Sequence, residues 1–386
     1  MNNPTHNFRE AKIILISYVT AGTGHRRAAE AIAEAVRKRL PHAQLECVDL
    51  LQDSPWWLQW AYPRIYKWFV RYIPSFWAIA YYVLDHPWVF RIVQPWRRRW
   101  NWLVARRFVR WVKSVQPDVV VATHFFPADV VAAAKQAGWL TSRLIVVLTD
   151  LFPHRLWLAP GAEAIVGATD QTKLICQTRG IEAQRVHVIG IPVRAEFSRP
   201  GDRHELRRKL GLDPSRVTLL MASGGMGIGP IPRLVRRVLA LEQDRPGRLQ
   251  LLVVCGYNRR LAKRLARVGA GSAMPVRIFE FVEPMHELMG ASDLLVTKAG
   301  GLTVVEACAL GLPMVFCGTI PGQERFNAQF AVQHGAGVMA RSVKEVVSVV
   351  LRLLENPGAL AEMRTNALAL GKPRAAEDLV ERLIVQ

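Results

Sequence analysis

Short apolar runs that lead through a glycine turn into a helical stretch recur in both halves of this sequence. The first unit joins the run 13–19, a glycine turn and a helical stretch over 25–40 that carries one apolar stripe. A second series begins with the run 217–222, and glycine turns follow at 223–229 and 299–301. Strands separated by helices indicate a parallel sheet, because the helix returns the chain to the edge where the next strand starts. The pattern therefore predicts an α/β fold.

The 386 residues are too many for one small module and suffice for two large domains. Strands are predicted first at 13–19, 44–49, 118–122, 143–149, 163–167 and 186–190, and then at 217–222, 249–254, 276–280, 293–297 and 313–317. Segment 191–203, which contains Pro192, Pro200 and Gly201, interrupts the alternation and is interpreted as the linker. We expect an N-terminal domain over 1–195, a C-terminal domain over 196–370, and a helical tail over 371–386 that packs back on the first domain.

Aromatic and basic residues are concentrated in residues 56–111. This window holds ten of the twelve tryptophans and five of the seven tyrosines. It contains ten arginines and lysines but one acid, Asp85, so the window supplies +9 of the net charge of +20. Tryptophan and tyrosine favour the water–hydrocarbon boundary, and each basic residue near an anionic leaflet adds about 1 kcal/mol of attraction. We interpret the window as a helical membrane-binding surface for anionic lipid.

Within this window, residues 96–113 place apolar side chains on one predicted helix face and most cations on the other. The apolar face consists of Trp96, Trp100, Leu103, Val104, Phe108 and Trp111, and the cations include Arg98, Arg99 and Arg106. Two other interpretations remain open, an aromatic packing region with solvated arginines and a surface that stacks nucleic-acid bases. No nucleic-acid motif accompanies the window, so nucleic acid is not an expected partner.

The cysteine pattern and the polar start of the chain indicate the compartment. No two of the five cysteines form a C-x-x-C pair, and we interpret them as buried thiols of a protein in a reducing compartment. The first twelve residues are polar, and no apolar run approaches the length of a membrane span. We expect a cytosolic protein, or one attached to a membrane from that side.

The first glycine loop brings backbone N–H groups to a helix N-terminus, where an anion can bind. Its sequence, A-G-T-G-H, matches neither G-x-G-x-x-G nor the Walker loop, which argues against a dinucleotide or P-loop site. His25 follows in the first turn of the helix, where the helix dipole opposes protonation. We therefore expect a neutral imidazole that can accept a proton, with a capping or structural histidine as the alternative.

Residues 297–330 hold the most specific pattern in the chain. The helix that opens here has a first turn whose amides could hold a diphosphate, formed by Gly300, Gly301, Leu302 and Thr303. Glu306, one turn further, is placed to accept hydrogen bonds from a ribose diol. After the next strand, Gln323 and Glu324 offer donors and acceptors for sugar hydroxyls. An ordinary α/β turn would explain the glycines but not this polar pair.

At these residues the sequence resembles a known family, the inverting glycolipid glycosyltransferases that include monogalactosyldiacylglycerol synthase and the processive diacylglycerol glucosyltransferases. They are relatives of the peptidoglycan N-acetylglucosaminyltransferase. The resemblance runs through GTGH at 22–25, THFFPAD at 123–129, TDLFPHRLW at 149–157, SGG at 223–225 and the block 297–330. It implies the GT-B fold, two Rossmann-like domains that face each other across a cleft.

The resemblance also implies the reaction. A hexose, galactose or glucose, would pass with inversion from a UDP-sugar on the C-terminal domain to the hydroxyl of membrane diacylglycerol on the N-terminal domain. The product would be a β-glycosyl-diacylglycerol. The chain has no plant-type targeting extension, so a bacterial enzyme attached to the cytoplasmic face of the membrane is expected.

Single residues acquire roles from the same resemblance. His25 matches the catalytic base, and Asp150, at the carboxyl end of a predicted strand, is the other candidate or orients the base. The donor site would consist of Gly24, Gly224 and Gly225 near the diphosphate, Phe281 and Val282 at the uracil, Glu306 at the ribose, and Gln323 with Glu324 at the sugar. No D-x-D occurs in the chain, so neither a metal nor another cofactor is expected. Helix and loop amides, with Lys298 or Arg325, would stabilise the departing diphosphate.

Three alternatives remain open. A transferase could use UDP-GlcNAc and a polyprenyl-diphosphate-linked acceptor, which shares the membrane but not the lipid. A UDP-sugar 2-epimerase would share the donor site and need no membrane surface. A non-catalytic basic protein that binds membranes or nucleic acid would ignore UDP.

Overall fold

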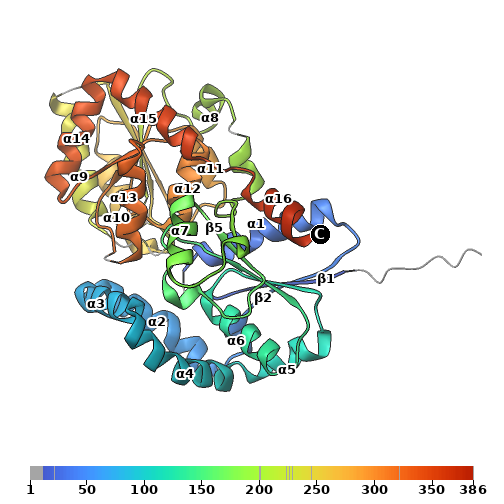
Figure 1. The fold of residues 1–386 in the computed structure, drawn as a ribbon. Helices are drawn as coiled ribbons and strands as arrows, with labels where there is room; N and C mark the ends of the chain where they lie inside the picture. The colour runs from blue at the N-terminus through green and yellow to red at the C-terminus, as the bar shows by residue number, and fades with distance from the viewer. Residues whose placement is uncertain are drawn as a thin grey trace, which may run out of the picture.

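The computed structural model describes residues 12–385 except 21, 200, 223, 226, 228, 245 and 321, without the side chains of residues 67, 70, 71 and 244. The polar start at 1–11 and three residues of the predicted glycine loop 223–229 therefore lie outside the described residues. Within them the chain forms two parallel sheets of six strands, one in each half (Figure 1). The predicted α/β class with two Rossmann-like domains is confirmed.

The first sheet has the order β2-β1-β3-β4-β5-β6. Its strands are β1 (Ile13–Tyr18), β2 (Gln44–Asp49), β3 (Val119–Ala122), β4 (Arg143–Val147), β5 (Ala164–Gly167) and β6 (Val186–Val188). The second sheet has the order β12-β11-β10-β7-β8-β9. Its strands are β7 (Val217–Ala222), β8 (Leu249–Val254), β9 (Val276–Phe279), β10 (Leu294–Thr297), β11 (Met314–Phe316) and β12 (Gly337–Met339).

Helices cover both faces of each sheet, which explains why the strands are continuous apolar runs rather than alternating ones. In β1, Ile14 and Ile16 belong to one core cluster and Leu15 to another on the opposite face. In the first half the helices are α1 (Gly24–Arg39), α2 (Trp56–Tyr72), α3 (Pro74–Asp85), α4 (Pro87–Val104), α5 (Arg106–Val115), α6 (Phe125–Gln136) and α7 (Asp170–Thr178).

The second half contains α8 (Arg203–Lys209), α9 (Ile231–Asp244), α10 (Arg259–Ala270), α11 (Met285–Gly290), α12 (Gly301–Ala309), α13 (Gln323–Gln333), α14 (Val343–Glu355) and α15 (Pro357–Leu370). The interpreted linker contains a short 3-10 turn, η4 (Ala195–Ser198). After α15, the short helix α16 (Ala375–Leu379) and a π-helical turn over Val380–Ile384 lie against α1 of the first domain. Leu379 and Leu383 share a core cluster with Ile32 and Val36 of α1.

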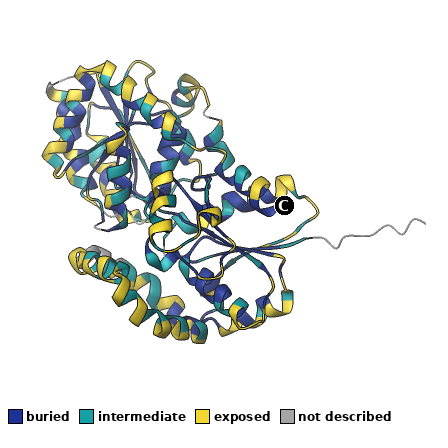
Figure 2. Ribbon diagram, viewed as in Figure 1, coloured by how far each residue is buried: buried dark blue, intermediate teal, exposed yellow. Residues whose placement is uncertain are grey.

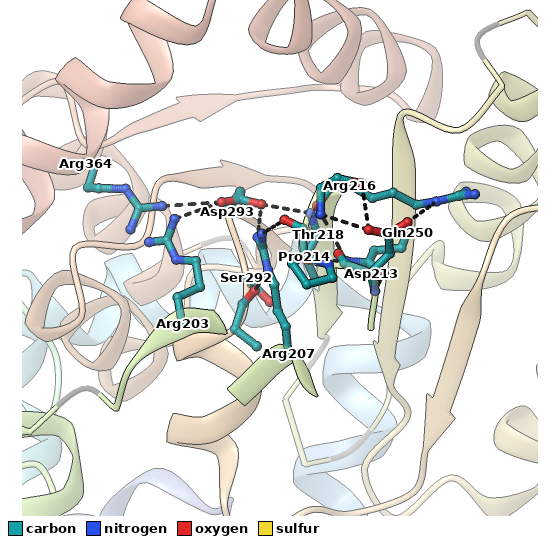
Figure 3. Close-up of polar contacts among 12 residues, drawn as sticks. Arg203, Arg207, Asp213, Pro214, Arg216, Thr218, Gln250, Ser292, Asp293 and Arg364 are labelled. Carbon is teal, nitrogen blue, oxygen red and sulfur yellow. Dashed lines mark hydrogen bonds and ion pairs between the residues drawn. The ribbon is translucent and has the colours of Figure 1, made fainter. Parts of the chain in front are cut away.

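An ion-pair network fastens the amino end of the second sheet (Figure 3). Asp293 precedes β10, and its carboxylate accepts a hydrogen bond of 2.8 Å from the backbone N–H of Thr218 in β7. The same carboxylate pairs with Arg203, at 2.9 Å, and with Arg207, both from α8. Arg364 of α15 approaches it to 3.9 Å. One carboxylate thus ties two helices to two strands at the edge of the sheet that lies away from the other domain.

The aromatic window folds into four helices, α2 to α5. Pro74 and Pro87 occupy the first positions of α3 and α4, where the missing N–H costs nothing. Most of the large apolar side chains that are exposed in the described part of the chain belong to α2, α3 and α4, and Figure 2 shows these helices as largely exposed. None of the described helices is both long enough and apolar enough to span a membrane.

The single apolar face expected over 96–113 is wrong, because the helix breaks at Ala105 between α4 and α5. Trp96 and Trp100 are 74% and 52% exposed. Phe108, by contrast, is buried, and Trp111 packs partly buried against the same core cluster. Trp111 is thus a packing residue, and the exposed aromatic side chains of this segment belong to α4.

Candidate active site

The carboxyl ends of the two sheets face each other along one interdomain surface. After β7, Gly225 lies so close to Thr23 that an added Cβ would be 2.6 Å from its methyl group. After β10, a Cβ on Gly301 would lie 2.3 Å from the carbonyl oxygen of Thr149. Only glycine permits these approaches. The domains therefore meet at the edges where open α/β sheets place their ligands.

His25 lies in the first turn of α1, and its ring is held by loops of the first sheet. Its Nδ1 lies 3.0 Å from the carbonyl oxygen of Thr123 and 2.9 Å from Oγ1 of Thr149. A carbonyl oxygen can only accept, so Nδ1 carries the proton and Nε2 keeps its lone pair. His124 and Trp157, with ring centres 4.7 and 5.6 Å away, shield part of the ring from water.

This desolvation lowers the pKa of His25 to about 4, although the hydrogen bond to Thr123 opposes the shift. The imidazole is therefore neutral at physiological pH. The helix position alone predicts a neutral ring through the helix dipole, whereas burial is the main cause in the structure.

His124 is a second buried imidazole that sequence reasoning did not select. Its Nδ1 accepts a hydrogen bond of 3.1 Å from the N–H of Phe126, so in the neutral ring the proton is on Nε2. Burial lowers its pKa well below the ordinary value, and the neighbouring groups His25 and Arg97 lower it further. Its place directly after β3, at a carboxyl end, was the signal that could have identified it.

Asp150 follows β4 and lies against the first turn of α12. Its Oδ1 accepts a hydrogen bond of 3.0 Å from the side-chain amide of Asn327 in α13. The same amide donates to the carbonyl of Ala299 at 3.0 Å, and its oxygen accepts from the N–H of Leu151 at 3.0 Å. Burial raises the pKa of Asp150 to about 6, against the Asn327 hydrogen bond. Fully buried Asn327 thus links the two domains beside Asp150.

Glu306 is buried one turn into α12 and faces the first domain. The closest cation is Arg27 of α1, with 3.6 Å between Nη1 and Oε1. Burial raises the pKa of Glu306 to about 7, and the charge of Arg27 works against this rise. The Arg27 guanidinium also lies 5.5 Å from the ring centre of Phe281, which stacks on Tyr257 at 4.3 Å. The structure thus connects the residues expected at the ribose and the uracil through one arginine.

The predicted sugar-binding pair begins α13. Gln323 is partly exposed, whereas Glu324 is buried. One oxygen of Glu324 pairs with Lys298 at 2.5 Å, and the other accepts from the N–H of Ile320 at 2.7 Å. Glu324 therefore holds Lys298 and the preceding turn in place, and the Lys298 side chain reaches Gly224.

The remaining predicted donor residues lie on the same interdomain surface or at its border. Gly300 is the N-cap of α12, and Gly301, Leu302 and Thr303 form its first turn. Gly24 lies opposite, where an added Cβ would be 4.0 Å from Leu302. Val282 packs at the border of the second core. Among the described residues, no group of three or more His, Cys, Asp or Glu side chains is arranged to hold a metal ion.

Comparison with known proteins decides the family. The family model described as monogalactosyldiacylglycerol (MGDG) synthase matches residues 25–193, and that of the glycosyltransferase family 28 C-terminal domain matches 218–379. Monogalactosyldiacylglycerol synthase 1 of Arabidopsis thaliana is 31% identical over 96% of this chain and 70% of its own length. The spinach (Spinacia oleracea) synthase is also 31% identical, over 96% of this chain and 72% of its own length. The chain belongs to the MGDG synthase family.

Solved structures confirm that this MGDG synthase family member has the GT-B fold. MurG of Acinetobacter baumannii superposes with a TM-score of 0.63 at 16% identity, covering 97% of this chain and 100% of that one. Anabaena HepE in complex with UDP gives 0.57 at 16% identity, covering 97% and 100%. The protein is thus a glycosyltransferase of the MGDG synthase and family 28 type.

In this family member, helices α2 and α3 turn tyrosines toward the interdomain surface. The ring of Tyr81 packs against Gly322 of the second domain, and its carbonyl accepts a hydrogen bond of 2.9 Å from His154 Nε2. Burial raises the pKa of Tyr66, and the charges of Glu324 and Asp150 raise it further. The inner side of the aromatic helices therefore borders the residues of the site.

Asp85, the one acid of the aromatic window, anchors these helices to the loop after β4. Arg179, directly after α7, binds both of its oxygens, at 2.7 and 2.6 Å. The N–H of Arg155 donates to it at 2.8 Å. Because Arg155 lies five residues after Asp150, the attachment point of the aromatic helices and the site share one loop.

Proposed function

We propose that this protein transfers galactose from UDP-galactose to the hydroxyl of membrane diacylglycerol, with inversion, to give a β-galactosyl-diacylglycerol. The observation that carries the proposal is the neutral His25, whose Nδ1–H is fixed by Thr123 and whose Nε2 lone pair remains available at the meeting line of the two sheets. Galactose is preferred over glucose because the relatives above are galactolipid synthases by name.

In the reaction, Nε2 of His25 takes the proton of the acceptor hydroxyl while that oxygen attacks the anomeric carbon of the sugar. The bond from this carbon to the diphosphate oxygen breaks, and UDP leaves with the electron pair. One displacement inverts the anomeric centre. Thr123 and Thr149 keep the imidazole in the required tautomer and orientation.

The departing diphosphate acquires negative charge, which the first-turn amides of α12 are suited to stabilise. Lys298 adds a cation, held in place by Glu324 next to Gly224. These groups support a reaction that needs no divalent metal.

The aromatic helices would keep the enzyme on the bilayer, where the acceptor resides. Their exposed faces carry Trp88, Trp96 and Trp100, side chains that favour the interface. A cavity of about 440 Å³ beside α4 is lined in part by Trp88, Arg91, Arg98 and Arg155, which suits the phosphate of an anionic lipid. We propose peripheral attachment at the cytoplasmic face of a bacterial membrane, with anionic lipid as activator.

The test is transfer of label from UDP-galactose and, separately, from UDP-glucose into diacylglycerol liposomes, with and without anionic lipid and in excess chelator. We expect product with UDP-galactose that increases with anionic lipid and is lost in H25A. Product with UDP-glucose only would correct the donor. No product with either donor, despite UDP binding, would favour the polyprenyl-linked acceptor or the epimerase.

A further inference from the structure

The first turn of α1 carries two arginines, Arg26 and Arg27, at a helix end where the dipole disfavours cations. Arg26 is compensated within its own helix, by an ion pair of 2.7 Å with Glu30 one turn further. The carboxylate closest to Arg27 belongs to the other domain, since its guanidinium lies 3.6 Å from Glu306. Arg26 therefore pairs within its own helix, whereas Arg27 reaches across the interdomain surface to the second domain.

Glu306, the partner of Arg27, is buried, and burial disfavours the charged form of a carboxylate. The Glu306 side chain is only 5% exposed, and that of Arg27 is 22% exposed. A buried carboxyl without a cation takes up a proton rather than remain charged. A protonated Glu306 presents one acceptor oxygen less to a ribose diol than the ionised group does. The ionisation of Glu306 thus matters for the role proposed for it, and Arg27 is two residues from the base His25.

We propose that Arg27 is a positioning residue for the donor site, supplied by the acceptor domain, which keeps Glu306 ionised for the ribose and so sets the pH range of UDP binding. This inference rests on the proposed function for the identity of the donor as a uridine nucleotide. Arg27 also faces Phe281, where the uracil is expected, so the same side chain contacts both parts of the nucleoside site.

Arg27 is the main cation near Glu306 that can keep its carboxylate ionised. Of the elements that pack against α12, α1 supplies Arg27 and the segment before η4 supplies Arg194, whose charge also reaches Glu306. Arg194 is itself engaged by Glu196 at 2.6 Å and by Glu283 at 3.5 Å. On α13, Glu324 is paired with Lys298, and on α15, Arg364 points to Asp293.

The experiment is calorimetric titration of the full-length protein with UDP between pH 6 and pH 9, because UDP carries the ribose and needs no acceptor. With Arg27 in place, the pKa of Glu306 is about 7, so wild-type affinity should fall as pH decreases through that value. In R27M the fall should move to higher pH, with affinity about 10-fold lower at pH 7 and near the wild-type value at pH 9. R27K should restore most of the wild-type profile.

Two controls separate this effect from a structural one. R26M removes the neighbouring cation, which pairs inside α1, and should leave the pH profile unchanged. In an E306Q background, R27M should have little further effect, because the group on which Arg27 acts no longer titrates.

The outcomes distinguish this inference from the proposed function. A loss of affinity in R27M that is equal at all pH values, or no loss, would overturn the inference alone. A wild-type protein that binds UDP but transfers no sugar to diacylglycerol would overturn the proposed function alone. A wild-type protein that binds no UDP would contradict both.

Discussion

The carboxylates at the two edges of the second sheet have opposite surroundings. At the amino edge, Asp293 is surrounded by arginines of two helices and by a backbone N–H (Figure 3). At the carboxyl edge, Glu306 has one cation at 3.6 Å and a pKa raised to about 7, and Asp150, opposite, has a pKa raised to about 6. Asp293, whose oxygens are occupied by arginines and a backbone N–H, stabilises the fold. Glu306 and Asp150 have pKa values near neutral pH and face the interdomain surface, so they are suited to ligand binding. Substitutions at the two edges should therefore separate stability from function.

The largest effect on stability is expected from D293A. It removes the partner of Arg203 and Arg207 and leaves the buried guanidinium of Arg207 without a carboxylate, which should cost about 3–5 kcal/mol. Denaturant unfolding measures this loss, and UDP affinity per folded molecule should stay at the wild-type value. A change in UDP affinity at full folding would break the proposed division between the edges.

The largest effect on chemistry is expected from H25A. Loss of the proposed general base should lower kcat for sugar transfer by about 10²- to 10⁴-fold. UDP affinity per folded molecule should change little, because His25 belongs to the first domain and the nucleotide is expected on the second. H124A is the matched control within the same ring cluster, and an equal loss there would show that packing, not proton transfer, is being measured.

A smaller effect with the opposite sign on stability is expected from D150N. The pKa of Asp150 is raised to about 6 in the folded state, so its charge opposes folding. This penalty grows as the pH rises from the unfolded-state pKa of about 3.9 to about 6, is complete above pH 6, and disappears near pH 3, where the carboxyl is protonated in both states. D150N, which can still accept from Asn327, should therefore be more stable by about 1–3 kcal/mol at pH 8 and unchanged at pH 3. Thermal unfolding at both pH values measures this difference, and stabilisation at pH 3 as well would contradict this cause.

The smallest effects are expected at the aromatic helices. Truncation of Trp88, Trp96 and Trp100 to alanine should weaken binding to anionic liposomes by about 10- to 100-fold while UDP affinity stays unchanged. W111A is the control from the same segment. Because Trp111 packs against the core, this variant should lower the melting temperature and leave liposome binding per folded molecule intact. The reverse pattern would show that the exposed face was assigned wrongly.

The sequence predicted eleven of the twelve strands in the described part of the chain, because apolar runs are local signals. It missed β12, which has only three residues. It did not predict the break at Ala105, since alanine favours helix and nothing nearby marks an end. Nor could it predict the contacts of Arg27, Asn327 and His124, whose partners lie far away in the chain. Neutral His25 was expected from its helix position, but its main cause, burial of the ring beside His124 and Trp157, exists only in the folded molecule.

In the proposed reaction, one base at the carboxyl edge of the sheets drives a single displacement. The anomeric configuration of the glycolipid formed from the α-linked UDP-sugar, read by proton NMR of the purified product, tests it most directly. We expect a β-linked sugar, formed by the wild type and lost in H25A. An α-linked product would contradict it, because retention requires a second displacement or a different geometry of attack.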